Sequence, residues 1–170
     1  MEALRISLRL VHIFAGTLWV GAALFITLFL EPTVRSAGPE GGRFMDRLTS
    51  GTPLVKYMIS ASLLTVITGV ALYTIDSGFS LSWIASREGL IFSIGSISGL
   101  GAYATGLFVI SPTAQRIGAL GHEMAMAGGP PSSPQLAEMS SLENRAMRSG
   151  RLEMILMVLA VAGMAGARLF

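Results

Sequence analysis

The chain has 170 residues, of which 52% are hydrophobic and 13% are charged, and its mean hydropathy is +0.64. Because a soluble domain carries about a quarter charged residues, this composition predicts an integral membrane protein formed by a single domain, residues 1–170. The chain has no cysteine, so we exclude disulfides, structural zinc sites and cysteine-ligated iron–sulfur clusters. Its net charge of +2 comes with scattered arginines that flank apolar runs, so we also exclude nucleic acid partners.

Four apolar segments follow one another along the chain, and a helix needs about 20 such residues to cross a bilayer core. The first covers residues 10–30 and is too long for the roughly 7–15-residue apolar region of a secretory signal peptide. The second and third cover residues 57–75 and 90–110. The fourth, residues 152–169, is the weakest, since Glu153 and Arg168 must extend toward the interfaces. These segments predict an all-α fold, an integral membrane four-helix bundle in contact with the lipid bilayer.

The connections 31–56 and 111–151 lie on the side of the membrane opposite to the two termini. Cytoplasmic connections of membrane proteins carry an excess of Lys and Arg. The terminal side has Arg5, Arg9, Arg87 and Arg168, and the connection side has Arg35, Arg43, Arg47, Lys56, Arg116, Arg145, Arg148 and Arg151. This bias predicts a bacterial inner-membrane protein with both termini outside and both connections in the cytoplasm.

The second connection is too long for a simple bundle loop. Its first part places Ile117, Leu120 and Met124 on one helical face, so we expect the third helix to restart after Pro112. The segment "GGPPSSP" then breaks the helix. A further helix should lead into the fourth span, with a cap at Ser140 or Ser141.

One histidine, His12, lies inside the first span. In a helix, Gly16 and Trp19 follow it on the same face, one and two turns along. A histidine inside a membrane needs a partner, which is either a neighbouring helix or a metal. Because Gly16 has no side chain, it lets a neighbouring helix or a planar group come close to His12. Spacing alone favours a hydrogen bond to a neighbouring helix that packs closely at Gly16.

The segment "HIFAGTLWVGAALF" resembles the first helix of the copper-resistance-D-like membrane proteins. It is also similar to the membrane portion of bacterial urate oxidases and, more distantly, to HemJ-type protoporphyrinogen oxidases. In these groups the first-span histidine is followed by a tryptophan, a small residue and an aromatic residue, a pattern that His12, Trp19, Gly21 and Phe25 match. The resemblance implies a b-type haem with His12 as an axial ligand, or otherwise copper handling, and with haem it implies electron transfer or small-molecule redox chemistry.

A second axial ligand is harder to find, because the other histidine, His122, lies on the far side of a bilayer core roughly 30 Å thick. Met164, late in the fourth span, is the strongest candidate, since His/Met ligation occurs in cytochromes. The alternative is packing, because the methionine also belongs to an apolar stripe at helical spacing. Arg9, Arg87 and Arg168 lie at the level of His12, where they would bind the haem propionates or anchor the helices at the interface.

Small residues form two further stripes, Gly95, Gly99, Ala102 and Gly106 in the third span and Ser62, Thr65 and Gly69 in the second. Such stripes let helix backbones approach closely. They would pack helices within the bundle, join two subunits or make room for a porphyrin. Packing is the commonest role, and a small-residue face also suggests a homodimer or a subunit of a larger membrane complex.

Two other functions remain open from the residues. His122, Met124 and Met126 are reasonable ligands for copper, which makes copper transport or resistance the first alternative. The second is a non-catalytic assembly subunit of a membrane complex. His12 distinguishes these functions, because a scaffold has no need for a histidine in its first span.

Overall fold

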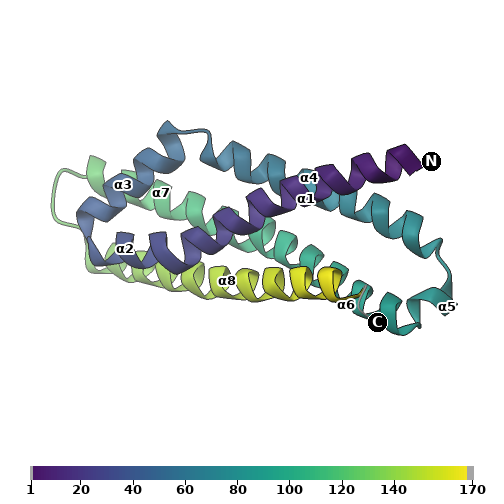
Figure 1. Ribbon diagram of the computed structural model, residues 1–170. Coiled ribbons are helices and arrows are strands. Elements are labelled where there is room, and N and C mark those ends of the chain that lie inside the picture. The colour runs from purple at the N-terminus through teal and green to yellow at the C-terminus, as the bar shows by residue number, and fades with distance from the viewer. Residues whose placement is uncertain (1, 168–170) are drawn as a thin grey trace.

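A computed structural model describes residues 2–167, which form helices joined by turns, with no strand in that range. Four helices in the described chain are long and apolar enough to cross a membrane: Glu2–Ser36, Leu54–Ser77, Arg87–Met126 and Ser133–Gly166. They lie along one another as a bundle (Figure 1). The prediction of an all-α four-helix bundle is therefore confirmed, and the chain is a multi-pass membrane protein.

The first and third spans are longer helices than hydropathy indicates, because each continues through a proline. α1 (Glu2–Phe25) passes through η1 (Ile26–Leu30) into α2 (Glu31–Ser36), and α6 (Arg87–Thr105) passes through η2 (Gly106–Ile110) into α7 (Ser111–Met126). Both η segments are π-helices, in which Glu31 N–H donates to Ile26 O and Ser111 N–H donates to Gly106 O. The wider π turn precedes Pro32 and Pro112, which lack an N–H, and the helix continues beyond them.

The second and fourth spans are single helices, α4 (Leu54–Ser77) and α8 (Ser133–Gly166). α8 begins at a capping box formed by Ser132 and Gln135. The predicted caps at Ser140 and Ser141 are wrong, because the lead-in and the span form one uninterrupted helix. The connections contain α3 (Pro39–Gly51) and the short α5 (Leu81–Ile84).

The four long helices pair as two hairpins, α1 with α4 and α6 with α8. The start of α1, the helix α5 and the end of α8 lie toward one end of the bundle, which we call the terminal end (Figure 1). α2, α3 and α7 lie at the opposite end, called here the connection end (Figure 1).

The interior of the bundle is small, as expected of helices that face lipid. Its buried core contains Trp19 and Ala23 of α1, Ala61 of α4, Ala102 of α6 and Met157 of α8. The ring of Trp19 meets the ring of Tyr103 edge to face, with centroids 6.2 Å apart. Large apolar side chains on the outer faces are exposed, among them Phe14, Ile97 and Phe108.

The glycine stripe of the third span packs inside the subunit. A Cβ added to Gly95 would lie 3.0 Å from Met164 N, and one added to Gly163 would lie 2.8 Å from Gly95 Cα. The α6 and α8 backbones are therefore in direct contact at these glycines. This stripe serves packing within the bundle and is not free to join two subunits.

Candidate functional site

His12 is half-buried between α1 and α4, where its Nδ1 makes two contacts. Nδ1 lies 2.9 Å from the carbonyl oxygen of Thr65 and 3.3 Å from Oγ1 of Thr68. A carbonyl oxygen can only accept a hydrogen bond, so Nδ1 carries the proton and donates. The Thr68 hydroxyl lies 2.6 Å from Leu64 O, to which it donates, and this leaves its oxygen lone pairs for His12.

The second ring nitrogen of His12 is available for a ligand. Within residues 2–167 no hydrogen-bond partner faces Nε2. The only buried, unpaired side-chain nitrogen or oxygen in that range is Nε of Arg5, so Nε2 of His12 is not sealed inside the bundle. In the neutral imidazole with the proton on Nδ1, Nε2 carries the lone pair. This is the arrangement in which a histidine ligates a metal while a backbone carbonyl fixes its ring.

Gly69 of α4 makes room for the imidazole. A Cβ at this position would come within 2.8 Å of Cε1 and 3.2 Å of Nδ1 of His12. Contacts this short do not occur with real side chains, so any larger residue would displace the ring or the helix. The close approach between α1 and α4 therefore depends on a glycine opposite the histidine.

Gly16 and Trp19, the other predicted residues of the first span, lie against neighbouring helices. A Cβ on Gly16 would lie 3.5 Å from Cγ2 of Thr65, so α4 covers the face that we expected to admit a planar ring. Trp19 is 5% exposed and fills the centre of the bundle. The hydrogen bond from His12 to α4 and the close packing at Gly16 match the interpretation that spacing alone favours.

Met164 packs against α6, whereas His12 packs against α4. The methyl carbon Cε of Met164 would lie 3.8 Å from a Cβ on Gly99, and its backbone adjoins Gly95. Met157, another methionine in the apolar stripe of the fourth span, is 1% exposed and lies in the core of the bundle. No described interaction joins Met164 to His12 within residues 2–167, and its role as a second axial ligand stays a prediction.

The predicted cationic residues of the terminal end have different surroundings. Arg9 lies one turn before His12, and its Nη2 is 3.5 Å from Oδ2 of Asp76 on α4. Arg87 is the first residue of α6. Arg168 lies outside the described residues.

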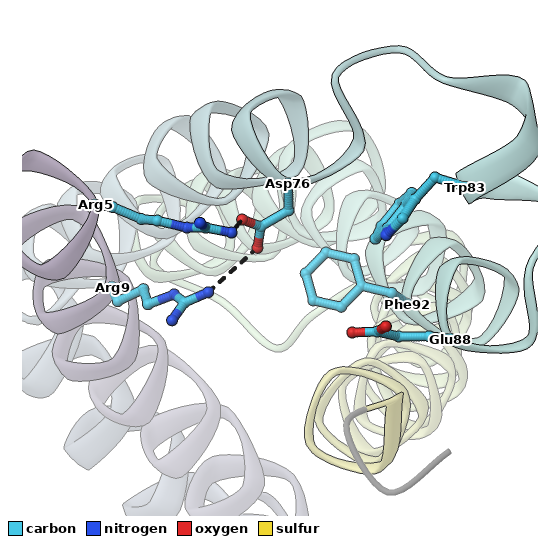
Figure 2. Close-up of a pocket in the computed structure, with 6 residues that line it drawn as sticks. All are labelled: Arg5, Arg9, Asp76, Trp83, Glu88 and Phe92. Carbon is cyan, nitrogen blue, oxygen red and sulfur yellow. Dashed lines mark hydrogen bonds and ion pairs between the residues drawn. The ribbon is translucent and has the colours of Figure 1, made fainter. Parts of the chain in front are cut away.

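A pocket of about 110 Å³ lies at the terminal end, where α1, α4, α5 and α6 meet. Arg5 pairs with Oδ1 of the same carboxylate that Arg9 approaches. Figure 2 shows the two arginines reaching from α1 toward Asp76, with two aromatic rings on the other side. The lining residues are Arg5, Arg9, Asp76, Trp83, Glu88 and Phe92.

The connection end does not bring all three possible copper ligands together, although His122 and Met126 share a face of α7. His122 and Met126 are exposed on α7, and Met126 ends that helix. In an α-helix Met124 lies about 200° around the axis from His122, so the three side chains do not converge. Among the described residues no three His, Cys, Asp or Glu side chains form a group that could hold a metal ion.

Glu153 of α8 lies against the π segment η2. Its Oε1 would lie 3.1 Å from a Cβ on Gly106. The glycine that we expected to continue the packing stripe of the third span therefore makes room for a carboxylate.

Comparison of the chain with protein-family models, with curated proteins and with solved structures finds no match. The family resemblance of the first span stays a prediction.

Several residues around His12 and the pocket are not evident as a site from the sequence. Thr65 and Gly69 belong to the small-residue stripe of the second span, but nothing in the sequence aligns that stripe with His12. Asp76, Trp83 and Phe92 occur in three different elements. Their nearness depends on how the helices pack, and the only sequence signal is that all of them lie near the terminal side.

Proposed function

We propose that the protein is a membrane b-type haem protein in electron transfer or small-molecule redox chemistry, with His12 as an axial ligand. The observation that carries this proposal is the orientation of the imidazole. Nδ1 donates to the carbonyl of Thr65 at 2.9 Å, so in the neutral imidazole the lone pair is on Nε2, which has no partner within residues 2–167. A ring nitrogen held in this way is suited to an iron atom.

His12 fits the role of an iron ligand, but the interior of the subunit does not offer room for a porphyrin ring. Trp19 is buried in the core, while the partly buried Gly16 and Met164 pack against Thr65 of α4 and against α6, so these contacts already use the faces that a ring would need. The pocket near Arg9 measures about 110 Å³, below the ~300 Å³ at which sites for larger ligands begin. The support is therefore for a haem at the surface of the bundle, on the open side of His12.

This chain's own residues would orient and tune the group. Thr65 and Thr68 hold the ring of His12, and Gly69 lets it lie between the two helices. A bound b-type haem supplies a reversible one-electron couple whose potential depends on its axial ligands. The lipid-facing apolar side chains of α1 would exclude water from the cofactor.

The test is a reduced-minus-oxidised absorption spectrum of the protein purified from haem-sufficient cells. We expect a Soret band that His12→Ala abolishes and that the matched control His122→Ala retains. Absence of any Soret band in the wild-type protein would reject the haem proposal, and metal analysis would then test copper. A Soret band retained in His12→Ala would assign the histidine to helix packing.

We propose in addition a bacterial inner-membrane location with both termini outside, supported by the excess of Lys and Arg in the connections. We also propose a homodimer or a subunit of a membrane complex, since an electron carrier must meet a partner. The contact would use a face other than the glycine stripe, which α8 covers. Labelling of cysteines introduced at the two ends measures the orientation in the membrane. The mass of the protein in detergent measures its oligomeric state.

A further inference from the structure

The pocket at the terminal end separates an ionic wall from an aromatic wall. Arg5 and Arg9 of α1 and Asp76 of α4 form the ionic wall. Trp83 of α5 and Phe92 of α6 lie on the other side, with ring centroids 6.1 Å apart (Figure 2). A planar ring bound between these walls would contact aromatic side chains on one side and polar groups on the other.

The aromatic wall is held rigidly by its neighbours. Tyr73 stacks on Phe92 with centroids 5.9 Å apart and an interplanar angle of 24°, and it meets Trp83 edge to face. The Tyr73 hydroxyl lies 2.7 Å from Oγ of Ser93, which fixes the tyrosine in turn. A rigid aromatic surface binds a ring at a low cost in conformational entropy.

The charges of the pocket indicate an uncharged ligand with polar edges. Two arginines and two carboxylates, Asp76 and Glu88, line it, so their formal charges cancel. Arg5 pairs closely with Asp76, whereas Arg9 is 3.5 Å from it and keeps donors for a ligand. Glu88 lies on the α6 side, apart from this cluster (Figure 2). A ring oxygen, carbonyl or hydroxyl, would accept from Arg9 on one side, and where the opposed oxygen is a hydroxyl it would also donate to Glu88.

The segment between two of the pocket's lining residues, Asp76 and Trp83, exposes large apolar side chains. In the turn between Asp76 and Trp83, Phe79 has a φ of 56°, the one positive φ of a non-glycine residue in the described chain, and its side chain is 76% exposed. Leu81 beside it is 82% exposed. A backbone conformation that costs energy and presents an aromatic side chain outward suggests a functional constraint. Because these side chains lie in the chain between Asp76 and Trp83, they offer an apolar surface to the tail of an amphiphile.

We propose that this pocket binds the ring of a membrane quinone and its quinol, with the tail of the molecule leaving past Phe79. A volume of about 110 Å³ suits a single ring, and the position at the membrane interface suits a lipid-soluble molecule with a polar head. The inference deepens the proposed function, on which it rests, by naming the class of redox partner.

The test uses a benzoquinone with a ten-carbon tail, titrated against the protein in detergent while tryptophan fluorescence is recorded. The chain has two tryptophans, Trp83 in the pocket and Trp19 in the core. We expect saturable quenching that persists in Trp19→Phe and disappears in Trp83→Phe. A ten-carbon alcohol without the ring should not compete.

Variants of the pocket walls measure the site itself. Phe92→Leu should weaken binding about three- to tenfold through the lost ring contact, and Arg9→Gln should weaken it about tenfold or more through the lost charged donor. The matched control is Phe108→Leu, which changes a 70% exposed phenylalanine in η2. Its binding should equal that of the wild type.

Failure of this inference and failure of the haem proposal are distinguishable. His12→Ala should lose the Soret band and keep the quenching of Trp83. Quenching that does not saturate, that affects both tryptophans equally or that is unchanged in Phe92→Leu would show simple partition of the probe into the micelle and overturn the quinone site.

Discussion

The two helical hairpins of the bundle repeat the same local design but pack in different ways. In each, a long helix passes through a π segment, residues 26–30 or 106–110, and reaches a proline followed by threonine. Thr33 Oγ1 donates to Phe29 O at 2.7 Å and Thr113 Oγ1 donates to Val109 O at 2.6 Å, so even the side-chain hydrogen bonds correspond. The hairpins differ in what lies between their helices.

In the α6–α8 hairpin, glycine faces glycine, and backbone meets backbone at Gly95 and Gly163. In the α1–α4 hairpin, a glycine faces an imidazole, and hydroxyl and carbonyl groups hold that ring. Contact between backbones maximises van der Waals packing and places no reactive side chain between the helices. The first hairpin uses the same closeness to hold an imidazole, and we therefore expect it to carry function and the second to carry stability.

The largest expected effect is on the α6–α8 hairpin. Gly163→Leu introduces a side chain where even a Cβ would lie 2.8 Å from Gly95 Cα. Because backbone atoms cannot move aside as a side chain does, we expect a loss of about 3 kcal/mol or more in the free energy of unfolding. Thermal denaturation in detergent measures it.

The matched control for that variant is Gly21→Leu, since nothing lies within 4 Å of a Cβ at Gly21. We expect its melting temperature to remain close to the wild-type value. Equal melting temperatures of the two leucine variants would contradict backbone contact between α6 and α8.

A smaller effect is expected in the α1–α4 hairpin. Gly69→Ala places a methyl group 2.8 Å from Cε1 of His12. Because the ring must shift, we expect the free energy of unfolding to fall by about 1–3 kcal/mol. In a His12→Ala background the same substitution should cost little, since the ring is gone. This double-mutant cycle isolates the contact, and an unchanged cost in both backgrounds would show that Gly69 acts through another neighbour.

The smallest effect is expected from the hydroxyl that supports the imidazole. Thr68→Val removes the 3.3 Å contact with Nδ1 and leaves the bond to the Thr65 carbonyl. We expect a loss of about 0.5–1.5 kcal/mol, measured by thermal denaturation, with Thr68→Ser close to the wild type. If the haem proposal holds, the reduction potential of the cofactor should shift in Thr68→Val and not in Thr68→Ser.

Much of the fold follows from residue order alone. Hydropathy locates the four spans because each crosses a layer of fixed thickness, and an even number of spans places both ends of the chain on the same side. The isolated His12 in an apolar run is visible in the same way. The continuous helices through Pro32 and Pro112 are not, because proline by itself indicates a helix end, and only the structure shows the π turn that lets each helix continue.

The residues that face one another in the candidate site could not be predicted from the order of residues in the chain. The sequence by itself determined an all-helical membrane chain, the number of its spans and the one histidine inside the apolar segments 10–30, 57–75, 90–110 and 152–169. Only the tertiary structure decided that Gly69 faces His12, that Gly16 is covered by Thr65, and that Asp76, Trp83 and Phe92 border one pocket. The physical reason is that an apolar helix has no strong preference for one rotation about its axis in lipid, so the facing residues are chosen by close packing between helices.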